Sequence, residues 1–316
     1  MKRSVLTIIC FLVCSSLLYA QNDWMKTSRE EASGKIKKDA NDTVPALWKK
    51  GGIFNVNINQ GSLTNWAAGG DKFSFSVASN LNAYAFYKKG KNNWDNVLDL
   101  AYGYVNTTSL GGRKSDDRIG ITTKYGYEVG RNLYLSALLD LRTQFTDGYL
   151  YPSSDTAKPT LVSRFFAPAY ILVSPGLDYK PSDQLSVFFS PVTARYVVVV
   201  DDYLAAQGAF GVDTGKHVKN ELGAYLTVNW VKTLGKNIVY KTRMDLFSDY
   251  KHNPQNIDLF WTNSLNLQVN KHISANVSVD MIYDDDVKVF KNEKTGVMGP
   301  RLQVKQVIGV GFTAKF

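Results

Sequence analysis

The chain has 316 residues, of which 44% are hydrophobic and 13% aromatic, so it carries too many apolar side chains to remain disordered. After residue 20 it contains no run of eighteen uninterrupted apolar residues, which excludes a bundle of membrane-spanning helices. The formal net charge of +9 comes from 37 basic and 28 acidic residues that are interspersed along the chain. This distribution argues against a nucleic-acid-binding surface.

The first twenty residues have the features of a secretory signal peptide. Two basic residues precede an apolar run over 5–18, and Ala20 supplies the small residue expected before a cleavage site. Both cysteines of the chain, Cys10 and Cys14, fall inside this segment. Its removal would leave a secreted chain without disulfides, and a closed hydrogen-bonded barrel is one fold that is stable without them.

The chain then divides into a polar tail over 21–50, which we expect in the periplasm, and a barrel domain over 51–316. From Gly51 onward the dominant pattern is an alternation of apolar and polar residues. Over 301–316, for example, the even positions are apolar except for Gln306, and most odd positions are polar or small. Such segments run for about ten residues or more, which is longer than the usual strand of a soluble sheet.

Twelve strands are predicted, with fourteen as the alternative count. They are expected at roughly 53–60, 72–88, 91–106, 117–130, 132–146, 167–180, 184–200, 219–233, 237–249, 257–269, 272–284 and 301–316. Short turns follow the even-numbered strands, and longer loops, such as those at 107–116 and 147–166, follow the odd ones. This layout predicts an all-β, antiparallel up-and-down transmembrane β-barrel of the bacterial outer membrane. A soluble sandwich also alternates, but it gives no reason for its loops to be sorted by length.

The last strand carries a candidate assembly signal. Phe312 and Phe316 lie on its apolar side, and Phe316 is the final residue. An aromatic residue at the end of an amphipathic last strand is similar to the signal read by the outer-membrane assembly machinery. We therefore expect this machinery and outer-membrane lipid to be partners of the chain.

Several motifs resemble one protein family. The stretches 59–71, 94–104, 113–118, 134–145 and 204–212 are similar to a Bacteroidota-type family of outer-membrane proteins known only as a domain of unknown function. The most specific of them are the sequences QGSLTNW, within 59–71, and GAFGV, within 204–212. The resemblance covers essentially the whole chain after the signal peptide. It implies an outer-membrane location and a barrel fold, but no activity, cofactor or catalytic residue.

The polar sides of the strands predict a lumen lined by balanced charges. Its seven acidic and seven basic residues are expected to be Asp99, Glu128, Asp140, Asp178, Glu221, Asp245 and Asp280 with Lys124, Arg142, Arg195, Lys241, Arg243, Arg301 and Lys305. A charge-selective pore would show a surplus of one sign, whereas balanced charges can pair and close the lumen. We therefore expect a structural or accessory role in an envelope complex, with a passive channel for small solutes as the alternative.

The predicted loops give weaker signals. The segment 204–212 is unusually apolar and is expected to pack into the barrel mouth or against a partner. The acidic triple at 284–286 lacks the spacing of a calcium loop, so no metal or cofactor is predicted. An outer-membrane hydrolase is a second alternative, because His252 and Asp249 could form a base near Ser248. No spacing among these residues is diagnostic, and an enzyme is not expected.

Overall fold

A computed structural model describes residues 47–64, 71–151, 158–182, 184–270, 272–287, 290–291 and 297–316. The predicted signal peptide and most of the predicted polar tail lie outside these residues. In the described part of the chain, no helix is both long enough and apolar enough to cross a membrane.

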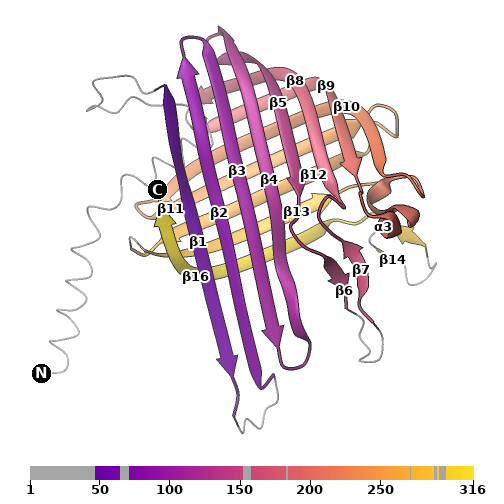
Figure 1. Cartoon of the computed structure of the whole chain (residues 1–316). Helices are drawn as coiled ribbons and strands as arrows, with labels where there is room; N and C mark the ends of the chain where they lie inside the picture. Colours follow the sequence, from indigo (N-terminus) through magenta and orange to yellow (C-terminus); the bar gives the residue numbers. More distant parts are fainter. Residues whose placement is uncertain are drawn as a thin grey trace, which may run out of the picture.

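Twelve strands form a closed antiparallel barrel, which confirms the predicted fold and strand count (Figure 1). The strands are β1 (Trp48–Ser62), β2 (Phe73–Lys89), β3 (Asn92–Thr107), β4 (Gly111–Gly130), β5 (Leu133–Thr143), β8 (Ala169–Ser182), β9 (Leu185–Val198), β10 (Val218–Gly235), β11 (Ile238–Asp249), β12 (Ile257–Gln268), β13 (Ile273–Tyr283) and β16 (Gln303–Lys315). Each strand pairs with its neighbours in sequence, and β16 closes the barrel against β1.

The shorter elements all lie in the long connections at one rim. They are the hairpin of β6 (Gly148–Leu150) and β7 (Thr160–Ser163), the short helices α3 (Asp202–Ala206) and η1 (Ala209–Gly211), and the pair β14 (Phe290–Lys291) and β15 (Met298–Gly299). Figure 1 shows β6, β7, α3 and β14 gathered together, far from the C-terminus. We call this end the loop rim. Two-residue turns at 90–91, 131–132 and 236–237 mark the opposite, turn rim.

Three predicted boundaries are wrong. The expected long loop at 107–116 is mostly strand, because β3 runs to Thr107 and β4 already begins at Gly111, directly opposite it. This hairpin end is polar, and its sequence therefore lacks the apolar alternation that marks a membrane strand. β1 begins at Trp48 inside the expected tail, where it pairs with Tyr87. Arg301 precedes β16, because β13 ends at Tyr283 and offers no strand residue opposite it.

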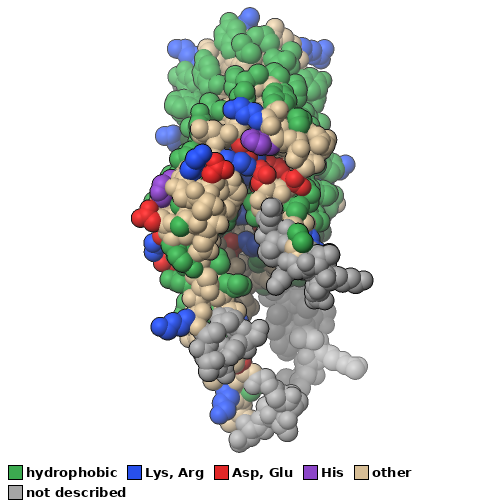
Figure 2. All heavy atoms as spheres, turned by 90° about the vertical axis from the view of Figure 1, so that its right-hand side faces the viewer, with side chains coloured by type: hydrophobic (Ala, Val, Ile, Leu, Met, Phe, Trp, Pro, Cys, Tyr) green, Lys and Arg blue, Asp and Glu red, His purple; other side chains and the backbone are tan. Residues whose placement is uncertain are grey.

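Alternation gives the barrel wall two faces. Large apolar side chains on the outer face are well exposed, including Leu135 (58%), Ile308 (66%) and Val310 (59%). Figure 2 shows hydrophobic side chains covering the upper barrel wall, with most charged side chains nearer the loops or at the edges. The opposite parity faces the lumen and is largely polar. A soluble protein would bury such a continuous apolar outer surface.

Candidate functional site

The lumen is the candidate site, and it has two chemically different walls. A cavity of about 400 Å³ lies inside the barrel. The charged wall is formed by β3–β5 and β8–β11, and its strands β3, β4, β5 and β11 contribute aspartate, lysine and arginine to the cavity lining. The amide wall, formed by β12, β13, β16, β1 and β2, contributes mainly Asn, Ser, Thr and Gln side chains. Among the described residues, Asp280 is the one charged residue that the amide wall adds to the cavity lining.

A ring of four charges crosses the middle of the lumen from β5 to β11. Arg142 lies 2.8 Å from Asp140 and 2.5 Å from Asp245, measured between nitrogen and oxygen. Arg243 lies 3.1 Å from Asp140 and 3.0 Å from Asp245. Tyr225 donates its hydroxyl proton to Asp245 at 2.9 Å. Each of the four charges therefore contacts two opposite ones, which offsets the cost of burying them.

A second cluster lies nearer the turn rim. Lys180 pairs with Asp95 at 2.6 Å, and Lys124 pairs with Asp178 at the same distance. Ser186 donates to the second oxygen of Asp178 at 2.9 Å. Lys180 is almost completely buried, so its ammonium group depends on these carboxylates. The cluster connects β3, β4, β8 and β9 across the interior.

A third cluster lies in the lumen near the loop rim. Arg195 pairs with Glu221 and, at 2.5 Å, with Asp258. Lys219 pairs with Glu221 at 2.7 Å and also with Asp286 in the connection after β13. The guanidinium of Arg195 also stacks on the ring of Phe247 at 4.1 Å. These contacts tie β9, β10 and β12 to a loop of the same rim.

A fourth cluster joins the two walls. Arg118 on β4 lies 3.3 Å from Asp99 and 3.6 Å from Asp280 on β13. Lys305 on β16 lies 2.5 Å from Asp116 and 3.8 Å from Asp280. The ion pairs therefore extend from the charged wall to the strands on the other side of the lumen.

Eleven of the fourteen predicted lumen charges take part in these four clusters. Of the other three, Lys241 lines the cavity and Glu128 is half-buried near the turn end of β4. Arg301 is exposed and lies outside the strand in which it was predicted.

Sequence reasoning also missed seven charged residues that these clusters contain. They are Asp95, Asp116, Arg118, Lys180, Lys219, Asp258 and Asp286. Lys180 and Asp95 share the parity of the predicted Asp178 and Asp99, so the two-residue period alone could have found them.

The two predicted assembly residues lie at the closing strand. The ring of Phe312 is 51% exposed and stacks on His272 with a centroid distance of 5.6 Å. Phe316 is 72% exposed, and its backbone N–H and C=O bond to the backbone of Gly52 at 3.2 and 2.9 Å.

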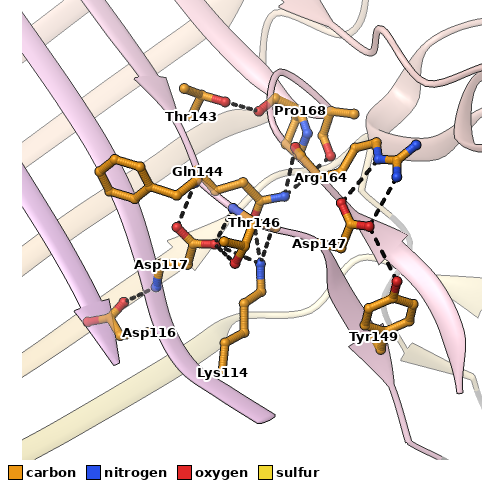
Figure 3. Close-up of polar contacts among 12 residues, drawn as sticks. Lys114, Asp116, Asp117, Thr143, Gln144, Thr146, Asp147, Tyr149, Arg164 and Pro168 are labelled. Atoms are coloured by element: carbon orange, nitrogen blue, oxygen red, sulfur yellow. Dashed lines mark hydrogen bonds and ion pairs between the residues drawn. The ribbon is translucent and has the colours of Figure 1, made fainter. Parts of the chain in front are cut away.

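The loop rim carries a network of polar contacts that we call the loop latch (Figure 3). Arg164 bonds Asp147 at 3.0 Å and Asp201 at 2.6 Å. Hydrogen bonds from Arg164 hold the pKa of Asp147 below its ordinary value. The backbone N–H of Leu204 and then Arg164 lower the pKa of Asp201. Asp117 accepts backbone N–H groups from the connection after β5, which fixes that loop to β4.

The apolar segment 204–212 packs at the barrel mouth, as its composition predicts. Leu204, Ala205 and Val212 are buried in one cluster with Val197 and Val199, at the end of β9 and just beyond it. Packing within the chain therefore explains why this predicted loop is rich in apolar residues.

The residues of the hydrolase alternative have the following geometry. His252 Nδ1 lies 3.0 Å from Asp249 Oδ2. The hydroxyl of Ser248 donates to the carbonyl oxygen of Pro254 at 2.7 Å. Within the described part of the chain, no group of three or more His, Cys, Asp or Glu residues is arranged to hold a metal ion.

The fold and lumen define a twelve-stranded β-barrel with an apolar outer surface and a polar interior. Residues 58–149 match a family model described as Protein of unknown function (DUF3078). A search of curated proteins found no match.

Solved structures with a similar fold include three bacterial membrane proteins. The COG4313 outer membrane channel from Pseudomonas putida F1 is 10% identical with a TM-score of 0.39, covering 89% of this chain and 100% of that one. The translocator domain of autotransporter NalP from Neisseria meningitidis is 12% identical with a TM-score of 0.38, covering 93% and 96%. A Pseudomonas aeruginosa FadL homologue is 9% identical with a TM-score of 0.30, covering 85% and 88%.

Proposed function

We propose that this protein is an outer-membrane β-barrel whose lumen is closed to general diffusion and which serves a structural or accessory role in an envelope complex. The observation that carries the proposal is the ring of Arg142, Asp140, Arg243 and Asp245, which crosses the lumen and neutralises its own charges. Three further ion-pair clusters lie on either side of this ring and between the walls. A barrel braced in this way lacks the wide water path of a general porin.

The outer surface supports the membrane location. Its exposed apolar side chains form the band that a lipid bilayer requires, and aromatic residues near the turn rim resemble an interfacial girdle. Trp94, for example, is 42% exposed, and its indole N–H donates to Thr123 at 2.8 Å. An indole with its polar atom satisfied and its ring exposed suits the boundary between lipid and water.

A second candidate function is passage of small solutes. The observation that favours it is the cavity of about 400 Å³ beside the amide wall, which the ion-pair clusters leave unfilled. A path of this kind would carry small uncharged molecules, because the acidic and basic residues of the cavity lining balance and the rest of its polar lining consists of amides and hydroxyls.

Single-channel recording in planar bilayers separates the two functions. If the lumen is closed, the unaltered protein shows little or no conductance, and Arg243→Ala raises it because a bulky member of the ring is removed. Lys216→Ala, in an exposed pair with Asp213 on the loop rim, is the matched control and leaves the conductance unchanged. A steady open conductance of the unaltered protein would contradict the closed lumen and support passage.

Labelling of whole cells tests the location and orientation. A single cysteine replacing Lys216 on the loop rim should react with an impermeant maleimide, and one replacing Lys236 at the turn rim should not. The reverse pattern would show that the turn rim, and not the loop rim, faces the cell exterior. Labelling of neither site, in intact or in opened cells, would argue against surface exposure of both rims.

A further inference from the structure

The barrel closes through an unusually short seam between β1 and β16. Only four register pairs join these strands, from Ile53 opposite Lys315 to Val56 opposite Phe312. By contrast, β1 pairs with β2 along all fifteen of its residues, and β16 pairs with β13 from Gln303 to Phe312. Figure 1 shows β16 meeting β1 near the C-terminus and then running away from it.

Toward the loop rim, the facing edges of the two strands are therefore unpaired. Gly52 and Phe316 exchange backbone hydrogen bonds across the seam. In an antiparallel strand, the N–H and C=O groups of every second residue point to the same neighbouring strand. The peptide groups that face the gap are thus the even-numbered ones. They belong to Ile58, Gln60 and Ser62 on β1 and to Val304, Gln306, Ile308 and Val310 on β16. Among the described residues, none pairs with these groups across the seam.

This gap lies at the depth of the apolar band. Ile58 is 62% exposed, and Ile308 and Val310 beside the gap are among the most exposed apolar side chains of the barrel. Peptide groups that face hydrocarbon without a partner are strongly unfavourable, so a molecule with hydrogen-bonding groups must satisfy them.

The cavity of the amide wall reaches the same gap from inside. Asn57, Val307 and Gly309 belong to the two seam strands and line the cavity. The amide of Asn57 packs on Gly309, where an added Cβ would lie 2.9 Å from its Cγ. Asn57 is buried, and its Oδ1 accepts no hydrogen bond from any described residue. An unsatisfied acceptor thus lies where the ladder ends.

The chemistry on the two sides of the gap indicates one class of ligand. Inside are amides and hydroxyls, and the charged residues Asp280 on β13 and Lys305 on β16 already pair with Arg118 and Asp116. Outside are aliphatic side chains. We propose that the β1–β16 seam is a lateral portal that binds an uncharged amphiphile, with its hydroxyl-rich head group against the amide wall and its acyl chain along the outer face. This inference rests on the proposed membrane location but not on whether the lumen conducts.

Amide hydrogen exchange of the full chain in phosphatidylcholine nanodiscs tests the portal. Because the cavity gives water access to the gap from the lumen, the amides of Ile58, Gln60, Ile308 and Val310 should exchange at least about tenfold faster than those of Asn59 and Gly309, which point to β2 and β13. Equally slow exchange along both strands would overturn the portal alone. Fast exchange throughout the barrel would overturn the proposed membrane insertion and the portal together.

The ligand class is tested by adding monooleoylglycerol or, separately, oleate at pH 8 to the same nanodiscs. The two probes share a chain and differ in head-group charge. Monooleoylglycerol should slow exchange at the even-numbered seam amides about tenfold, and oleate should not. Asn57→Ala should weaken this protection, whereas Asn59→Ala, on the same strand but exposed, should retain it. Equal protection by both probes, or by neither, would overturn the assignment even if Asn57→Ala does not fold.

Cysteine pairs give an independent measure of the gap, in a background where Cys10 and Cys14 are replaced by alanine. Continuing the seam register would place Ile58 opposite Val310. Ile58→Cys with Val310→Cys should therefore oxidise slowly, whereas Ile58→Cys with Val77→Cys, a true register pair between β1 and β2, should oxidise readily. Equal rates for the two pairs would show a closed seam and overturn the portal.

Discussion

Arg243 on β11 donates from Nη2 to Asp140 on β5 at 3.1 Å, which joins two strands that lie 103 residues apart in the sequence. β8, β9 and β10 separate these strands in the sheet, so the bond crosses the lumen rather than following the wall. Arg142 and Asp245 complete a ring in which positive and negative groups alternate. The ring therefore acts as a neutral crossbar between opposite parts of the barrel.

Loss of one member should destabilise the barrel. Asp140→Ala leaves two guanidiniums facing a single carboxylate in a buried site, so we expect the free energy of unfolding to fall by about 3–5 kcal/mol. Urea titration of the barrel in lipid vesicles, followed by tryptophan fluorescence, measures this change. Lys216→Ala breaks an exposed pair and should shift the titration by no more than its error. Similar titrations for both variants would show that the ring does not brace the barrel.

The apolar outer face of the wall gives a second test. Leu139 lies near the middle of β5, is 41% exposed and stands opposite Val173 on the outer face. Leu139→Arg should lower the free energy of unfolding by about 2–4 kcal/mol if the side chain meets the bilayer midplane. The control is Leu150→Arg in β6, at the loop rim and outside the barrel wall. It should change the free energy of unfolding little. Equal costs would place Leu139 outside the membrane.

The alternation of the sequence was sufficient to predict the barrel, because a strand that separates lipid from a polar lumen must repeat its chemistry every two residues. All twelve predicted strands overlap the observed ones. The same argument fails where a strand carries polar residues on both faces. At the end of the β3–β4 hairpin the apolar pattern stops at residues 111–117, while the pairing of β4 with β3 continues.

The partners within the lumen could not be predicted in the same way. The two-residue alternation places Lys305 and Asp116 on the inner face of the barrel. Their contact at 2.5 Å joins residues 189 positions apart, and it depends on the strand register and on the curvature of the barrel. The short seam was also hidden, because the alternating pattern continues beyond the last register pair, to Ile58 on β1 and to Ile308 and Val310 on β16. Only the Gly309 and Gly311 pair, which lets β1 approach β16 closely, marks the place in the sequence.

The loop latch should depend on pH. Asp147 and Asp201 have pKa values below the ordinary value of about 3.9, so protons bind them more weakly in the ordered latch than in an opened one. The stabilisation by these carboxylates is complete above that value and is lost as the pH falls through their lowered pKa values. Hydrogen exchange over 148–150 and 160–163 should therefore stay slow at pH 5 and accelerate near pH 3, after correction for the intrinsic rate. In the Arg164→Gln variant the amides of both segments should exchange quickly at both pH values, so the difference should disappear. An unaltered protein with equal protection at pH 5 and pH 3 would contradict the role of the two carboxylates.

The C-terminal aromatic residue should matter more for assembly in cells than for the stability of the finished barrel. Phe316 is largely exposed, and its contacts are backbone bonds to Gly52, which any residue could make, and packing of its ring against that glycine. Phe316→Ala should therefore change the free energy of unfolding in vesicles by less than about 1 kcal/mol. In cells, the same variant should accumulate as unassembled chain, measured by the loss of the fast-migrating folded band in unheated gels. Phe312→Ala, which removes the stacking on His272, tests whether the inner aromatic position shares this role. If Phe316→Ala assembles normally in cells, the residue is not a recognition signal, and if it fails equally in vesicles, its role is to close the seam.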